Sequence, residues 1–203
     1  MSDPLISVAE IVPCTQAEGP GRRFALWVQG CPLRCADCCN PEMLSFDGGT
    51  TRTVADILQQ IEDARSHNIE GITLIGGEPF AHAEPLSALA QQVRALDLSV
   101  MIFSGFTLPQ LQASTDTSVA ALLAQTDLLV DGPYDRTQPD NSRRWVGSLN
   151  QQIHFLTDRY SEEDACWSQR DTLEVRWDGH NLLVNGFPAG GATDLWRRPG
   201  ESS

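Results

Sequence analysis

Short apolar runs recur along the first 160 residues, and segments of helical spacing separate them. Each run is about as long as a buried strand and contains few charged residues. These runs predict strands at residues 23–29, 72–75, 98–103, 127–130 and 153–156.

The segments between the runs have the periodicity of amphipathic helices. After Thr53, apolar residues recur on one helical face, and Thr53 with Asp56 resembles a capping box. A second helix is expected to begin at Pro85, and a third near residues 119–124. Strands that alternate with helices predict a mostly parallel sheet with right-handed crossovers.

The length of the chain limits the architecture of this predicted α/β fold. A complete eight-fold barrel takes about 250 residues, and the chain has 203. We therefore expect a partial, open (β/α) barrel of about five or six units. The polar and glycine-rich motifs follow the predicted strands, and ligands in parallel α/β sheets bind beyond the carboxyl ends of the strands.

The pattern changes after about residue 160. Residues 172–177 alternate, a turn-like segment follows, and residues 182–187 return as a second run, which predicts a β-hairpin. We expect a main domain over residues 1–160 and a C-terminal extension over residues 161–203, with a loose tail behind the hairpin.

The charge of the chain excludes some partners. Lys plus Arg number 14 and Asp plus Glu number 27, so the formal net charge is −13. Nucleic acid and anionic membrane surfaces would repel such a chain. No apolar run approaches the roughly 18 residues of a membrane span, and the first residues lack the features of a signal peptide. We therefore expect a cytoplasmic protein.

The cysteines are the strongest chemical signal in the sequence. In a cytosolic chain, four cysteines within nine residues indicate metal or redox chemistry rather than disulfides. Cys31, Cys35 and Cys38 have the spacing Cys-x3-Cys-x2-Cys. A structural zinc site usually has four ligands, whereas three thiolates on one loop can hold three corners of a cubane iron–sulfur cluster. The fourth iron would then be open to a ligand.

Two alternatives to this interpretation remain. The loop could hold structural zinc, and Cys39 could act as a fourth ligand, although adjacent residues tend to point apart. Cys14, Cys39 and Cys166 are otherwise interpreted as ordinary thiols.

The cysteine loop, together with Gly76-Gly77-Glu78-Pro79 after the next strand, resembles the radical S-adenosylmethionine (SAM) superfamily. Residues 18–41 are most similar to the activating enzymes of glycyl radical proteins, in particular those of anaerobic ribonucleoside-triphosphate reductase. Residues 103–107, 129–132 and 147–151 also match activase motifs, in the expected order.

The resemblance implies a [4Fe–4S] cluster and SAM as cofactors. SAM would bind the open iron, and reductive cleavage would give methionine and a 5′-deoxyadenosyl radical that abstracts hydrogen from the substrate. The implied partners are a glycyl radical protein and an electron donor such as flavodoxin or ferredoxin.

The resemblance also implies roles for individual residues. Cys31, Cys35 and Cys38 would be the metal ligands. Gly76 and Gly77 would let the backbone approach the methionine moiety, and Glu78 would accept a hydrogen bond from its ammonium group. The full set of candidate cofactor-binding residues is Gly76, Gly77, Glu78, Pro79, Ser104, Asp131 and Asn150.

Two other functions stay open at this point. A single-cluster radical SAM enzyme could act on a small molecule or a peptide, and the segment after residue 160 lies outside the resemblance. A plain electron carrier is the third hypothesis, although such a carrier would not need Gly76 to Pro79.

Overall fold

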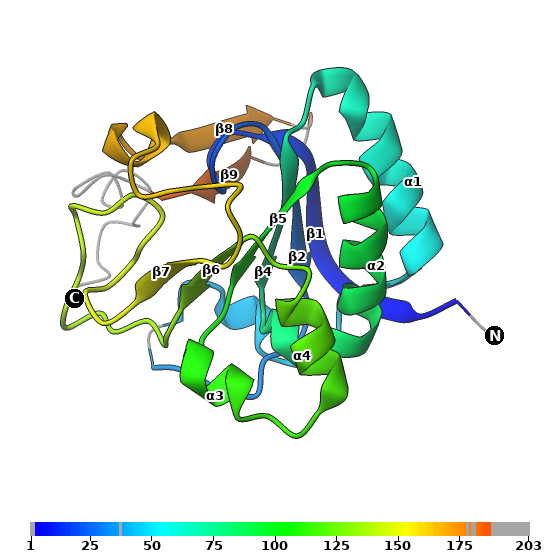
Figure 1. The fold of residues 1–203 in the computed structure, drawn as a ribbon, viewed down its shortest axis with the longest axis horizontal. Coiled ribbons are helices and arrows are strands. Elements are labelled where there is room, and N and C mark those ends of the chain that lie inside the picture. Colours follow the sequence, from blue (N-terminus) through cyan, green and yellow to red (C-terminus); the bar gives the residue numbers. More distant parts are fainter. Residues whose placement is uncertain (1–2, 37, 178, 180–181, 188–203) are drawn as a thin grey trace.

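Seven strands form one sheet in the order β3-β1-β2-β4-β5-β6-β7 (Figure 1). The computed structural model describes residues 3–36, 38–177, 179 and 182–187. The strands are β1 Leu5–Thr15, β2 Arg23–Val28, β3 Thr50–Thr53, β4 Gly71–Gly76, β5 Ser99–Phe103, β6 Leu128–Asp131 and β7 Gln152–Phe155.

The centre of the sheet is parallel and its flanks are antiparallel. Strands β2, β4, β5 and β6 run in one direction, whereas β1 is antiparallel to β2 and β3 is antiparallel to β1. The predicted α/β class and mostly parallel sheet are confirmed. A partial barrel of five or six units stays a prediction.

All five strands expected from the apolar runs are present, but the last one has a different direction. Strand β7 is antiparallel to β6, because residues 132–151 return the chain without the helix that a parallel crossover needs. Strands β1 and β3 were not predicted. Strand β3 has the polar sequence Thr-Thr-Arg-Thr, which gives no apolar signal.

Helices cover one face of the sheet (Figure 1). Thr53 caps the first of them as predicted: its hydroxyl accepts a hydrogen bond from the Asp56 amide, and the Asp56 carboxylate accepts one from the Thr53 amide. The second begins two residues before Pro85, and a further short helix, α3, was not predicted. The helices are α1 Val54–Ala64, α2 Ala83–Ala95, α3 Leu108–Gln112 and α4 Thr117–Leu123.

The main core lies between these helices and the sheet. It joins side chains of β2, β4 and β5, such as Leu26, Leu74 and Ile102, to Ile57 of α1 and Leu89 of α2. All five are fully buried. Successive side chains of a strand point to opposite faces, so the residues that alternate with these buried ones lie on the other face of the sheet.

The C-terminal extension packs on the opposite face. Its Trp167 contacts Trp145 and Phe155 edge-on, with ring centroids 5.3 and 5.4 Å apart. The predicted hairpin is confirmed as β8 Leu173–Trp177 paired with β9 Leu182–Gly186. The expected loose tail lies outside the described residues.

None of the helices in the described part of the chain is long and apolar enough to cross a membrane.

Candidate cluster and cofactor site

The carboxyl ends of the parallel strands lie at one edge of the sheet and carry the predicted site residues. The cysteine loop follows β2, Glu78 follows β4, Ser104 follows β5 and Asp131 ends β6. Hydrogen bonds join the first three: the Glu78 amide donates to the Gly30 carbonyl at 2.9 Å, and the Ser104 hydroxyl donates to Glu78 Oε1 at 2.9 Å. The predicted convergence of the strand ends is therefore observed for these residues.

The cysteine loop is closed at its base by backbone hydrogen bonds. The Gly30 amide donates to the Met43 carbonyl at 2.9 Å, and the Cys31 amide donates to the Leu44 carbonyl at 3.1 Å. These bonds tie the two ends of the loop together, so the three cysteines project from a constrained segment.

Gln29 stabilises the same loop, although it was not among the predicted site residues. Its side-chain amide donates to the carbonyls of Glu42 and Ser45 at 3.1 and 2.7 Å. Its own carbonyl lies 2.7 Å from His82 Nε2. Gln29 thus joins the loop to the segment after Glu78, and its position directly before Gly30 was the one available signal.

The three cysteine thiols lie close enough to influence one another. Cys31 is buried, while Cys35 and Cys38 are half-buried. Burial raises the pKa of Cys31 and Cys35, and for Cys35 the thiols of Cys31 and Cys38 raise it further. Within the described residues, no three His, Cys, Asp or Glu side chains converge as ligands of a single ion would.

This arrangement fits a cubane cluster. A cubane places each thiolate on a separate iron atom, so its ligands need not converge on one point. Three neighbouring thiols on one constrained loop would supply three such ligands. Cys39 is exposed, so we do not group it with these three thiols.

Gly76 and Gly77 allow the end of β4 to pack directly against the start of the cysteine loop. A Cβ atom on Gly77 would lie 2.3 Å from the Gly30 carbonyl oxygen, and one on Gly76 would lie 2.8 Å from the Cα atom of Trp27. Gly76 also has a φ of +104°, which favours glycine. The Cβ side of both glycines therefore faces protein backbone, and the expected approach of this backbone to the methionine moiety stays a prediction.

Glu78 is a buried carboxylate held by three donors. Its Oε1 accepts from the Phe80 amide and the Ser104 hydroxyl, and its Oε2 accepts from the Gly105 amide, each at 2.9 Å. Burial raises the pKa of Glu78 to about 7, although these hydrogen bonds act in the opposite direction. A carboxylate has about four acceptor positions, so the side chain retains capacity for one more donor.

Ser104 is engaged within the protein. Its hydroxyl donates to Glu78 and accepts from the Phe106 amide at 3.1 Å. The structure therefore gives Ser104 a clear role in orienting Glu78. A direct contact with ribose or carboxylate stays a prediction.

We expect Ser104→Ala to lower the free energy of unfolding by about 1–3 kcal/mol, because a buried carboxylate and a backbone amide each lose a partner. Chemical denaturation measures this change. Ser87→Ala is a matched control, since the Ser87 hydroxyl is exposed on α2 and bonds only to the Glu84 carbonyl among the described contacts. Equal stability of the two variants would contradict the role of Ser104.

Asp131 fastens the end of β6 to two neighbouring segments. Its Oδ2 accepts from the Leu108 amide at 2.5 Å, and His154 Nε2 lies 2.9 Å from the same oxygen. The His154 side chain is half-buried, with 22% of its surface exposed. No local sequence pattern indicates this pairing.

Asn150 lies in the loop between β6 and β7. Its side-chain amide donates to the Pro133 carbonyl at 2.7 Å. The adjacent Gln151 binds the Gly147 amide and the Gly132 carbonyl. No contact within the described part of the chain joins Asn150 to Glu78 or to the cysteine loop, so its cofactor role stays a prediction.

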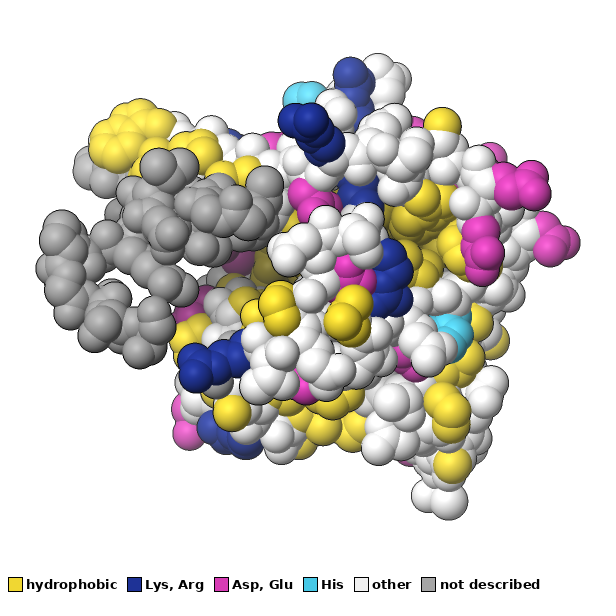
Figure 2. Space-filling model, turned by 90° about the vertical axis from the view of Figure 1, so that its left-hand side faces the viewer, with side chains coloured by type: hydrophobic (Ala, Val, Ile, Leu, Met, Phe, Trp, Pro, Cys, Tyr) yellow, Lys and Arg dark blue, Asp and Glu magenta, His cyan; other side chains and the backbone are white. Residues whose placement is uncertain are grey.

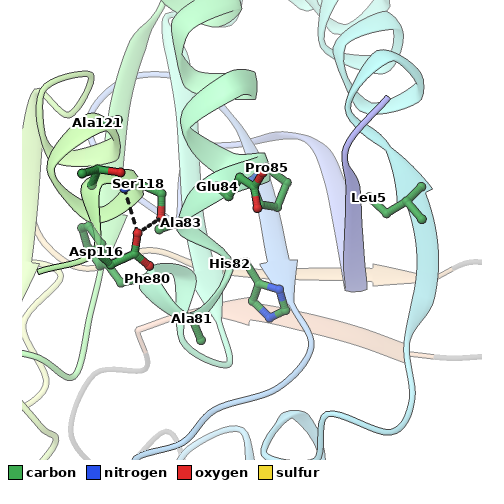
Figure 3. Close-up of a pocket in the computed structure, with 11 residues that line it drawn as sticks. Leu5, Phe80, Ala81, His82, Ala83, Glu84, Pro85, Asp116, Ser118 and Ala121 are labelled. Atoms are coloured by element: carbon green, nitrogen blue, oxygen red, sulfur yellow. Dashed lines mark hydrogen bonds between the residues drawn. The ribbon is translucent and has the colours of Figure 1, made fainter. Parts of the chain in front are cut away.

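A separate pocket lies between the starts of α2 and α4 (Figure 3). His82 and Glu84 line one side, and Asp116 on the other side accepts a hydrogen bond from the Ser118 amide at 2.9 Å. None of its lining residues is a cysteine or a candidate cofactor-binding residue. The pocket is therefore distinct from the cluster site.

Comparison with known proteins gives the family. A model described as a 4Fe-4S single cluster domain matches residues 17–154, which is more than half of the chain. The chain belongs to this family. The match confirms the predicted [4Fe–4S] cluster as a cofactor and speaks against the structural zinc alternative.

Curated relatives within the family narrow the resemblance. The anaerobic ribonucleoside-triphosphate reductase-activating protein of Vibrio cholerae is 36% identical over 153 residues, covering 71% of this chain and 95% of the relative. The protein of the same name from Pasteurella multocida is 32% identical over 160 residues, covering 75% and 99%. These relatives confirm the predicted resemblance to the activase subgroup of radical SAM enzymes.

One solved structure, that of QueE from Escherichia coli, has a TM-score of 0.40 at 21% identity and covers 51% of this chain and 53% of its own. This likeness is too weak to bear on the function.

Proposed function

We propose that the chain is a radical SAM enzyme that activates a glycyl radical protein such as an anaerobic ribonucleotide reductase. Cys31, Cys35 and Cys38 would hold a [4Fe–4S] cluster with one iron open to SAM. The observation that carries the proposal is the backbone connection between the three-cysteine loop and the Glu78 turn. The curated relatives named as reductase-activating proteins support it.

The protein residues bind and orient, and the cofactors supply the reactive chemistry. When bound and reduced, the cluster supplies the electron that cleaves SAM to methionine and a 5′-deoxyadenosyl radical. Glu78 would accept a hydrogen bond from the ammonium group of SAM, because its carboxylate is fixed by three donors and retains capacity. Ser104 would hold that carboxylate in place.

The remaining candidate residues have supporting roles in this proposal. Gly76, Gly77 and Pro79 would set the path of the turn that carries Glu78. Asn150 would contact the ribose or the carboxylate of SAM, and Asp131 would help to bind SAM, a cation or the substrate.

The wider setting is also part of the proposal. The sheet would curve as a partial barrel around the cluster, and a flavodoxin or ferredoxin would supply the electron. A cytoplasmic location would suit an oxygen-sensitive cluster with one open iron, since the cytosol keeps thiols reduced.

The direct test is to incubate the reconstituted protein anaerobically with SAM, a reductant and the candidate reductase. We expect a doublet glycyl signal by electron paramagnetic resonance, and no signal with Cys35→Ala. If no candidate partner gives the glycyl signal although SAM is cleaved, the activase role is wrong. The alternative enzyme, which modifies a small molecule or a peptide, would then be favoured.

A further inference from the structure

The β8–β9 hairpin lies outside the region that defines the family. The family model ends at residue 154, whereas the hairpin spans residues 173–186. The alignment with the Vibrio cholerae relative covers 95% of that protein but 71% of this chain. The hairpin therefore lies beyond the part of the chain that the family model matches.

Asn185 on β9 anchors the hairpin to the loop between β1 and β2. Its side-chain amide donates to Glu18 Oε1 at 3.0 Å and to the Thr15 hydroxyl at 3.1 Å. Glu18 is itself fixed to the sheet, because the Thr73 hydroxyl donates to its carbonyl at 2.7 Å. Both Asn185 and Glu18 are buried, with 9% and 3% exposure.

Phe187, directly after β9, reaches the neighbourhood of the cofactor site. Its ring stacks on Phe103, with centroids 5.9 Å apart and planes 28° apart. Phe103 ends β5 and precedes Ser104, which binds Glu78. Helices cover the opposite face of the sheet (Figure 1), so the hairpin and Phe187 lie on the face that the helices leave uncovered, beside the strand end that carries Ser104.

The anchor is incomplete in a way that favours opening. Asn185 Oδ1 is buried and has no partner within the described residues, which costs free energy in the closed position. Burial raises the pKa of Glu18 to about 7. The hydrogen bonds from Asn185 and Gly186 act in the opposite direction. Among the nearby charges, Glu174 raises the pKa of Glu18 and Arg176 lowers it. Two-stranded hairpins are also marginal by themselves, so segments of this kind open at low cost.

The outer face of the hairpin carries large apolar side chains that are exposed. Val175 pairs with Val184 and Trp177 pairs with Leu182 across the two strands, with exposures of 55, 41, 67 and 62%. Figure 2 shows a group of exposed apolar side chains at the upper left of the molecule. Burial of these four side chains therefore contributes little to holding the hairpin in its closed position.

We propose that the β8–β9 hairpin is a lid over the substrate face of the sheet, closed by Asn185 on Glu18 and by Phe187 on Phe103. The lid opens to admit the glycine-bearing segment of the protein substrate. This inference rests on the proposed activase function for its substrate, but the closed contacts themselves are independent of it.

We call the hydrogen bond from Asn185 to Glu18 the latch. Hydrogen–deuterium exchange of the full-length, cluster-loaded protein tests this latch without any assay of activity. We expect Asn185→Ala to speed exchange of the β8 and β9 amides by at least about tenfold, with β4 to β6 unchanged. Val184→Ala is the matched control, since it alters the adjacent residue on the exposed face. Unchanged exchange in β8 and β9, or faster exchange throughout the sheet, would overturn the latch.

Substitutions of Glu18 separate a hydrogen-bonded latch from a charge effect. Glu18→Gln keeps an acceptor oxygen for Asn185 and should exchange like the unaltered protein, whereas Glu18→Ala should match Asn185→Ala. If Glu18→Gln opens the hairpin as much as Glu18→Ala does, the latch as described is wrong.

Kinetics with the reductase then test the lid. Asn185→Ala should lower the KM for the protein partner several-fold at unchanged kcat, because less of the enzyme is closed. An unchanged KM despite faster hairpin exchange would overturn the lid. If no partner yields a glycyl radical in the unaltered protein, the proposed function fails instead, and the exchange results still decide the latch.

Discussion

Replacing Cys35 by alanine is expected to abolish assembly of the iron–sulfur cluster. Cys31, Cys35 and Cys38 would each bind a different iron, so two remaining thiolates cannot hold a cubane that already lacks a fourth protein ligand. After anaerobic reconstitution, the unaltered protein should contain about four iron atoms per monomer and the variant almost none. Iron and sulfide analysis with the visible absorption spectrum measures the difference.

Cys39→Ala is the matched control for this prediction. Cys39 is adjacent to Cys38 but exposed, and the account gives it no iron to bind. The variant should keep its full iron content. Loss of the cluster in Cys39→Ala to the same extent as in Cys35→Ala would indicate a four-cysteine site and would remove the open iron from the account.

Gly77→Ala is expected to have the second-largest effect, although it removes no ligand. Its Cβ would lie 2.3 Å from the Gly30 carbonyl oxygen, and a backbone atom cannot move aside as a flexible side chain can. We expect a loss of at least about 3 kcal/mol in the free energy of unfolding. The cysteine loop begins at Gly30, so the yield of reconstituted cluster should fall as well.

Gly179→Ala provides the comparison for Gly77→Ala. Gly179 has a φ of +97°, but a Cβ there would meet no atom within 4 Å. This variant should cost about 1 kcal/mol from backbone strain alone and should keep its cluster. Chemical denaturation of both variants decides the matter, and equal stabilities would show that the contact with Gly30 does not constrain the loop.

The central strands could be predicted because a parallel strand buried on both faces has a continuous apolar sequence. Strand β2 is buried at all six positions, and its sequence shows this plainly. Strand β1 mixes buried, half-buried and exposed positions, and its pattern is neither a continuous apolar run nor a strict alternation. The direction of β7 was not predictable from its own residues, because an apolar run contains no information about the partner strand.

The site was predictable where chemistry depends on spacing along the chain, and less so where it depends on tertiary contacts. The cysteine spacing is local, so it predicts the cluster ligands directly. Glu78 and Ser104 were selected separately, but their hydrogen bond joins residues 26 positions apart. The true neighbours of Gly76 and Gly77 are in β2 and the cysteine loop, which no local pattern reveals.

The most direct test of the central claim is SAM cleavage by the reconstituted protein alone. Incubated anaerobically with SAM and a strong reductant, the cluster-loaded protein should form 5′-deoxyadenosine and methionine in equal amounts, and Cys35→Ala should form neither. A protein that contains the full cluster and accepts electrons, yet forms no 5′-deoxyadenosine, would be an electron carrier and would contradict the account.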